Sequence, residues 1–137
     1  MATAPRLSPA LLTLIEDMFR TTYTLFGTED RLLIFRDGSG RLHPERPEME
    51  RRTGYVQGDI DLNREVAGDW WDLAYDLHSH HVMGAFWSST DDANERLRGI
   101  AFGVFSWRQE SGPTWLFRRF DGKSFVDLPY SEVVGDG

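Results

Sequence analysis

The chain has 137 residues, no cysteine and a formal net charge of −7. The absence of cysteine excludes disulfides, thiolate metal sites and cysteine nucleophiles. The negative charge argues against nucleic acid or an anionic membrane surface as the main partner. No apolar run approaches the ~20 residues of a membrane helix, and residues 1–6 contain no secretory signal, so we expect a cytoplasmic protein.

The first predicted element is a long helix over about 9–26. Ser8 can cap its free amide groups and Pro9 suits the first helical position. Apolar residues then recur at helical spacing, and Gly27 is a plausible terminator. This helix is expected to lay one apolar stripe on a sheet.

Strands and turns dominate the rest of the chain. Arg31–Phe35 reads as a buried strand that ends in the turn Asp37–Gly40. The stretch 42–52 is expected to be loop or weak strand, and the pair Trp70-Trp71 is interpreted as core. Further strands are expected over 52–57, 74–78, 100–107, 114–120 and 124–128, with a Gly112-Pro113 turn, a two-residue Asp121-Gly122 hairpin and a second helix over 88–97.

This order of elements predicts an α/β (α+β) fold in one domain over 1–137. We expect a central mixed sheet, flanked by the N-terminal helix and by the second helix. A chain of this length can bury one core and not two. The core is expected over about 8–130, and the tail 131–137 is expected to be flexible.

Three of the four histidines are clustered, and two of them are spaced to act together. On a strand, His78 and His80 point to the same side. If Ser88 begins a helix, Asp91 lies one turn along and faces the same way. Two imidazoles and one carboxylate make three protein ligands, and three ligands with one open position are typical of catalytic zinc.

The arrangement H-x-H-x7-S-x2-D, formed by His78, His80, Ser88 and Asp91, resembles the JAMM motif of the JAB/MPN metalloprotease family. The resemblance covers residues 8–130 and is sharp over 76–95. It implies a JAB/MPN-like domain in which His78, His80 and Asp91 bind Zn²⁺. It also implies that Ser88 stabilises the developing oxyanion.

The family uses an upstream Glu as general base, at the start of the strand that follows the first long helix. Glu29 occupies that position, directly before the strand at Arg31. The glycine that the family has a few residues later is replaced here by Leu32. Other glutamates compete for the role, namely Glu16, Glu45, Glu48, Glu50 and Glu65.

The surroundings of the motif depart from the family at two prolines. His81 stands where a proline usually follows the second His, and Trp87 stands where a proline precedes the Ser. By resemblance, the loop that holds Phe86 and Trp87 lines the active-site cleft. His81, Phe86 and Trp87 are therefore candidate substrate contacts, although packing or surface roles remain open for His81. Asp76 or Asp92 is a candidate for orienting a ligand histidine.

The resemblance implies a zinc (iso)peptidase that cleaves after the C-terminal glycine of a ubiquitin-like protein. A small chain of this kind looks like the prokaryotic members, which can work beside ubiquitin-like, activating and conjugating proteins. Two alternatives stay open: a non-catalytic MPN scaffold, and a JAMM-like peptidase that acts on a sulfur-carrier or phage-tail protein. The histidines could also be ordinary side chains of a strand that bind no metal.

Other metal-dependent classes fit the sequence less well. A histidinol-phosphatase-type phosphoesterase shares Asp-Leu-His-x-His, but it needs a larger barrel-like fold. A zinc deaminase needs a cysteine pair, which this chain lacks.

Overall fold

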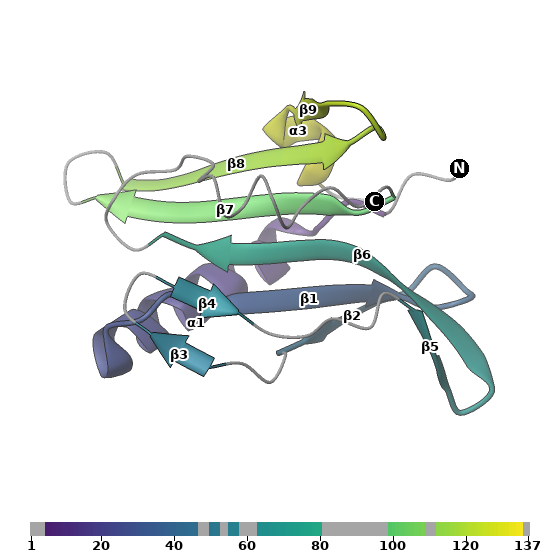
Figure 1. Cartoon of the computed structure of the whole chain (residues 1–137), viewed down its shortest axis with the longest axis horizontal. Coiled ribbons are helices and arrows are strands. Elements are labelled where there is room, and N and C mark those ends of the chain that lie inside the picture. Colours follow the sequence, from purple (N-terminus) through teal and green to yellow (C-terminus); the bar gives the residue numbers. More distant parts are fainter. Residues whose placement is uncertain are drawn as a thin grey trace.

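The computed structural model of the chain describes residues 5–46, 50–52, 55–57, 63–80, 99–108 and 112–135. It shows a mixed α/β architecture with a seven-stranded, mostly antiparallel sheet. A long helix lies behind the sheet in Figure 1. This confirms the α/β class and the mixed sheet. The second helix expected over 88–97 lies outside the described residues.

Helix α1 (Pro9–Phe26) has the predicted bounds and the predicted caps. The Ser8 hydroxyl accepts a hydrogen bond from the Leu11 amide at 3.1 Å, which satisfies one of the free amides of the first turn. Gly27 has φ +67°, a left-handed conformation that costs glycine little, and its N–H bonds the Tyr23 carbonyl at 2.7 Å. The sequence therefore fixes both ends of this helix locally.

The main sheet has the strand order β2-β1-β6-β7-β8-β9, and β5 also pairs with β6. All neighbours are antiparallel except β6 and β7. A parallel pair needs a long crossover connection, and the chain between Ser79 and Ala101 supplies it. A separate two-stranded ladder is formed by β3 and β4. The strands are β1 (Arg31–Arg36), β2 (Leu42–Glu45), β3 (Glu50–Arg52), β4 (Tyr55–Gln57), β5 (Asn63–Val66), β6 (Asp69–Ser79), β7 (Ala101–Arg108), β8 (Gly112–Phe120) and β9 (Phe125–Leu128).

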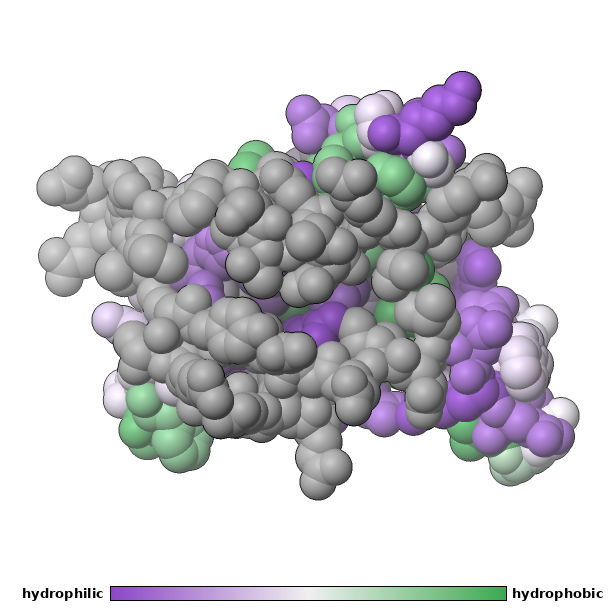
Figure 2. All heavy atoms as spheres, viewed as in Figure 1, coloured by the Kyte–Doolittle hydropathy of each residue, from purple (hydrophilic) through white to green (hydrophobic). Residues whose placement is uncertain are grey.

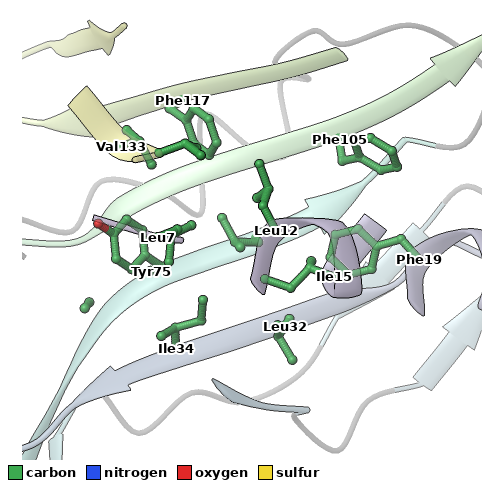
Figure 3. Packing of buried hydrophobic residues seen from close by; sticks show 13 residues of the cluster. Leu7, Leu12, Ile15, Phe19, Leu32, Ile34, Tyr75, Phe105, Phe117 and Val133 are labelled. Carbon is green, nitrogen blue, oxygen red and sulfur yellow. The ribbon is translucent and has the colours of Figure 1, made fainter. Parts of the chain in front are cut away.

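The main core lies between α1 and one face of the sheet (Figure 3). Phe19 and Leu12 of the helix pack there in one cluster with strand residues such as Leu77 and Phe105. Gly103 of β7 is required by this packing, since a Cβ there would lie 2.6 Å from Leu77 Cδ2. A second cluster covers the opposite face and consists of Leu33, Phe35, Leu73, Ile100 and Phe102, with Trp71 packed against it.

A bulge in β6 changes which side chains face the helix. The register between β1 and β6 shifts at Ile34/Phe35, where Ile34 pairs with Tyr75 and Phe35 pairs with Leu73. Tyr75 therefore belongs to the helix-side cluster, while Leu73 belongs to the opposite cluster. Beyond the bulge, Leu77 faces the helix, and by alternation His78 faces away from it.

Part of the predicted tail, residues 131–135, has defined structure with buried side chains. Short helix α3 (Tyr130–Val133) follows β9, and Val133 and Val134 are buried. The Leu7 amide donates to the Val133 carbonyl at 2.7 Å, and the Gly135 amide donates to the Leu7 carbonyl at 2.9 Å. The tail through Gly135 is therefore paired with the segment that precedes α1, because its two valines complete the helix-side core.

Several local predictions were wrong in detail. Gly112 and Pro113 begin β8 rather than forming a turn before it, and Trp70 is 56% exposed rather than core.

Figure 2 shows hydrophobic residues gathered at the lower left, over the end of α1, where Leu25 and Phe26 are exposed. Among the helices that the structure describes, none is both long and apolar enough to cross a membrane.

Candidate metal centre

The start of β1 and the end of β6 lie side by side, at the left of the sheet in Figure 1. Arg31 pairs with His78 in the antiparallel ladder. Continuing the same register by two residues sets Glu29 opposite His80. Two segments that are far apart in the sequence therefore meet at one corner of the sheet.

The two predicted histidine ligands converge on each other. The Nε2 atoms of His78 and His80 are 3.0 Å apart, and the ring centroids are 4.8 Å apart. His80 is buried, with 4% of its surface exposed, and His78 is partly buried. The His80 amide donates to the Phe105 carbonyl at 2.8 Å, which ties the end of β6 to β7. The prediction that these imidazoles act from one side of the strand is consistent with this geometry.

Glu29 is the described glutamate that lies at this pair. Its Oε2 atom is 3.9 Å from His80 Nε2, and the residue is 7% exposed. Three of the competing glutamates are engaged or placed elsewhere, whereas Glu48 and the side chain of Glu50 lie outside what the structure describes. Glu16 accepts a hydrogen bond from the Trp115 indole at 2.8 Å, Glu45 pairs with Arg64, and Glu65 is exposed on β5.

The histidine pair has the donor chemistry that zinc accepts. Zinc binds imidazole nitrogen at about 2.0–2.1 Å, so two nitrogens on one tetrahedral ion lie about 3.3 Å apart. The observed separation of 3.0 Å is shorter than that value and is a hydrogen-bonding distance between the two rings. Within the described part of the chain, no three or more His, Asp or Glu side chains are grouped as a complete metal site. The third predicted ligand, Asp91, lies outside it.

An ion pair lies beside the histidines on the face away from α1. The Arg31 guanidinium donates to Asp76 through Nε at 2.9 Å and through Nη2 at 2.6 Å. The side chains are 14% and 7% exposed. Asp76 is therefore bound to Arg31, and no described contact joins it to a histidine. The suggestion that Asp76 orients a ligand histidine has no support in this geometry, and Asp92 lies outside the described residues.

The structure brings together three of the predicted site residues and leaves the others undescribed. Glu29, His78 and His80 lie within one cluster. The remaining candidates lie outside the described residues, namely Ser88, Asp91, His81, Phe86 and Trp87.

Sequence reasoning missed the residues that hold this corner in place. Asp30 is fully buried and Ser79 is fully buried, and they bond each other across the two strands. Their position next to Glu29 and between the histidines was visible in the sequence. What identifies them is the register between β1 and β6, which the sequence did not specify.

No protein-family model and no curated protein matches this sequence. The interpretation of the site therefore depends on the motif and on the geometry of this chain alone.

Proposed function

We propose that this chain is a zinc-dependent peptidase of the JAMM type with a JAB/MPN-like fold. Its substrate would be the peptide or isopeptide bond after the C-terminal glycine of a ubiquitin-like protein. The observation that carries the proposal is the position of Glu29 beside His80, in a corner where His78 and His80 already converge. The JAMM motif requires a general base beside its histidines. Glu29 occupies that position although it is remote from His78 and His80 in the sequence.

The proposed roles follow the chemistry of each side chain. His78, His80 and Asp91 would hold the metal. Bound zinc supplies a Lewis acid and lowers the pKa of water from 15.7 to about 7. Glu29 would accept the proton of the attacking water and pass it to the leaving amine, which leaves poorly unless protonated. The Ser88 hydroxyl would donate to the developing oxyanion, a contribution worth about 3–4 kcal/mol when one such donor is lost.

The burial of the corner suits this chemistry. Glu29 and His80 are both below 10% exposed, so little bulk water surrounds them. Electrostatic interactions are stronger in such a setting than in water. The Glu29 carboxylate, held close to the two imidazoles, could therefore transfer protons without being drawn away by hydration.

The test combines metal analysis with hydrolysis. The purified chain is expected to bind about one zinc per molecule and to release a reporter fused after the C-terminal glycine of a ubiquitin-like protein. His78→Ala and Asp91→Ala are expected to lose both the metal and the activity. Retention of stoichiometric zinc by these variants would contradict the ligand assignment.

The same assay separates the substrate classes. Isopeptide-linked conjugates, linear fusions, a sulfur-carrier protein and a tail protein are compared at equal concentration. Cleavage after the ubiquitin-like glycine alone supports the proposal. Stoichiometric zinc with no cleavage of any substrate would favour the scaffold alternative.

A further inference from the structure

Asp30 is a buried carboxylate that the proposed chemistry does not use. It is fully buried, and it lies between Glu29 and Arg31. Its Oδ2 atom accepts a hydrogen bond from the Thr22 hydroxyl at 2.5 Å and another from the Arg46 guanidinium. Its Oδ1 atom accepts from the Arg31 amide at 2.8 Å. The side chain is thus anchored to α1, to the residue after β2 and to its own strand.

The main chain of Asp30 is fixed independently of its side chain. The Asp30 amide donates to the Ser79 hydroxyl at 2.9 Å, and the Ser79 amide donates to the Asp30 carbonyl at 3.0 Å. Ser79 is fully buried and lies between His78 and His80 in the sequence. One serine therefore links the segment of the proposed base to the strand of the proposed ligands.

We propose that Asp30 and Ser79 are positioning residues that hold Glu29 in place against His80. The inference rests on the proposed function, because it assumes that Glu29 acts at this corner. Asp30 is one peptide away from Glu29, so fixing its backbone at both ends limits where the Glu29 carboxylate can reach. A displacement of about 1 Å at a reacting group can cost about 100-fold in rate.

A role in stability alone accounts poorly for this arrangement. Burying a carboxylate with a guanidinium is often no more stabilising than packing apolar side chains of similar size. What the polar cluster supplies is a defined geometry, because each oxygen of Asp30 meets a directed donor. The geometry is transmitted to Glu29 because the two residues are adjacent.

A matched pair of buried threonines tests the proposal. Thr22 is 3% exposed and bonds Asp30, whereas Thr28 is 6% exposed and its hydroxyl has no hydrogen-bond partner among the described atoms. Thr22→Val and Thr28→Val remove the same hydroxyl from positions of similar burial. Thr22→Val and Ser79→Ala are expected to lower kcat by about 10- to 100-fold with KM and zinc content unchanged. Thr28→Val is expected to retain the wild-type kcat. Thr22→Ser, which keeps the hydroxyl that bonds Asp30, is expected to retain most of the wild-type kcat.

A second measurement does not depend on activity. Hydrogen–deuterium exchange of the zinc-loaded protein reports on the Asp30 amide, which Ser79 protects. Ser79→Ala and Thr22→Val are expected to speed exchange in the peptide that contains Glu29 and Asp30, and Thr28→Val is not. Equal exchange in all three variants would overturn the proposal, even if a substrate is never found.

The double variants separate this inference from the proposed function. In the Glu29→Gln background, Thr22→Val and Ser79→Ala are expected to have no further effect on kcat, because the group they position is already lost. A full-sized effect in that background would overturn the positioning role. A fully active Glu29→Gln protein would instead contradict the proposed base. If Glu29→Gln is inactive while Thr22→Val and Ser79→Ala match Thr28→Val, the positioning role alone fails.

Discussion

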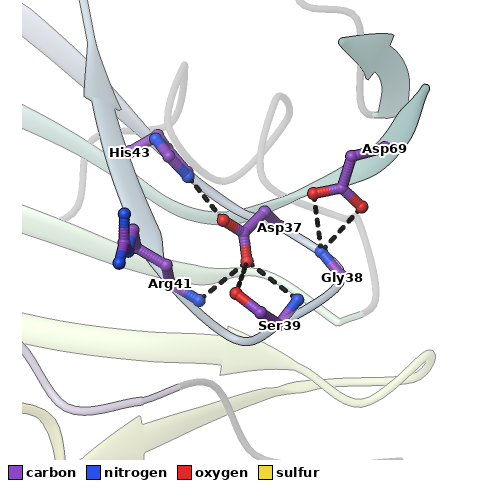
Figure 4. A network of polar contacts seen from close by, with 6 residues as sticks. All are labelled: Asp37, Gly38, Ser39, Arg41, His43 and Asp69. Atoms are coloured by element: carbon purple, nitrogen blue, oxygen red, sulfur yellow. Dashed lines mark hydrogen bonds and ion pairs between the residues drawn. The ribbon is translucent and has the colours of Figure 1, made fainter. Parts of the chain in front are cut away.

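The two ends of β1 each hold a histidine and a carboxylate, but the two pairs are used differently. After the strand ends, Asp37 Oδ2 accepts a hydrogen bond from His43 Nε2 at 2.8 Å. Its Oδ1 accepts from the Ser39 amide, the Ser39 hydroxyl and the Arg41 amide at 2.7–2.9 Å (Figure 4). Before the strand begins, Glu29 Oε2 lies 3.9 Å from His80 Nε2, beyond hydrogen-bonding distance.

The difference shows that a histidine near a carboxylate is not by itself a site. Asp37 is occupied by its own turn, and the hydrogen bond from His43 is the largest of several that hold the pKa of that carboxyl well below its usual range. At the other end, the structural bonds are made by Asp30, so the neighbouring Glu29 carboxylate is placed at the histidine pair. Adjacent residues therefore differ in position: Asp30 bonds the surrounding chain, and Glu29 lies at the histidines that we propose as metal ligands.

The largest expected contrast concerns metal binding. His80→Ala is expected to abolish the binding of about one zinc per chain, because it removes one of two converging imidazoles. His43→Ala is expected to leave the zinc content unchanged, because its imidazole is bonded within the turn. Elemental analysis of dialysed protein measures both. Zinc lost equally from the two variants would remove the distinction between the ends of β1.

The carboxylates are expected to differ in catalysis. Glu29→Gln is expected to lower kcat by about 10²- to 10⁴-fold while zinc is retained, since a general base contributes about that much. Asp37→Asn is the matched control at the other end of the strand and is expected to leave kcat within about twofold. Steady-state kinetics with a cleavable ubiquitin-like fusion measures both variants. An Asp37→Asn protein as inactive as Glu29→Gln would show that the turn also serves the reaction.

A buried ion pair beside His78 and an exposed pair on α1 are expected to contribute differently to stability. Asp76→Ala leaves the Arg31 guanidinium buried without its carboxylate, and removing one partner of a buried pair costs about 3–5 kcal/mol of unfolding free energy. Asp17→Ala, which removes the exposed partner of Arg20 on α1, is expected to cost less than about 1 kcal/mol. Urea denaturation measures both. Equal losses would show that the pair beside His78 is as well solvated as a surface pair.

The smallest expected effect is a pH dependence at the turn. The pKa of Asp37 is lower in the folded protein than in the unfolded chain, so its ionised form stabilises the fold above the unfolded value of about 3.9. This contribution is lost as the pH falls through the folded pKa. The stability difference between wild type and Asp37→Asn is therefore expected at pH 7 and is expected to shrink below about pH 4. Denaturation curves at the two pH values test this, and an unchanged difference would assign the effect to another group.

The sequence predicted the elements whose signals are local. Ser8, Pro9 and Gly27 define α1 through caps that depend on neighbouring residues only. The strand at Arg31–Phe35 was recognised from an unbroken apolar run, and the structure extends it by one residue. Strand β5 was missed, because Asn63–Val66 has neither an apolar run nor a clear alternation, and its place depends on pairing with β6.

The candidate site was predicted in part, for a different physical reason. His78 and His80 could be paired from strand periodicity, and Glu29 was placed through the resemblance to the JAMM pattern. Their proximity depends on the ladder between β1 and β6, which joins segments far apart in the chain. The anchoring role of Asp30 and Ser79 depends on that same ladder, so no local pattern could reveal it. The misjudged exposure of Trp70 has the same origin, since the sheet arrangement decides which tryptophan is covered.

The bulge in β6 makes one strand serve two opposite requirements. If every residue of β6 were paired and alternated strictly, Leu73, Tyr75, Leu77 and Ser79 would lie on a single face. Either the apolar residues at the start of the strand or the histidines at its end would then point to the wrong side. A regular ladder in which Ala74 also had its own partner on β1 would exchange inside and outside for half of the strand, so the unpaired residue between Leu73 and Tyr75 is as much a part of the site as the histidines themselves.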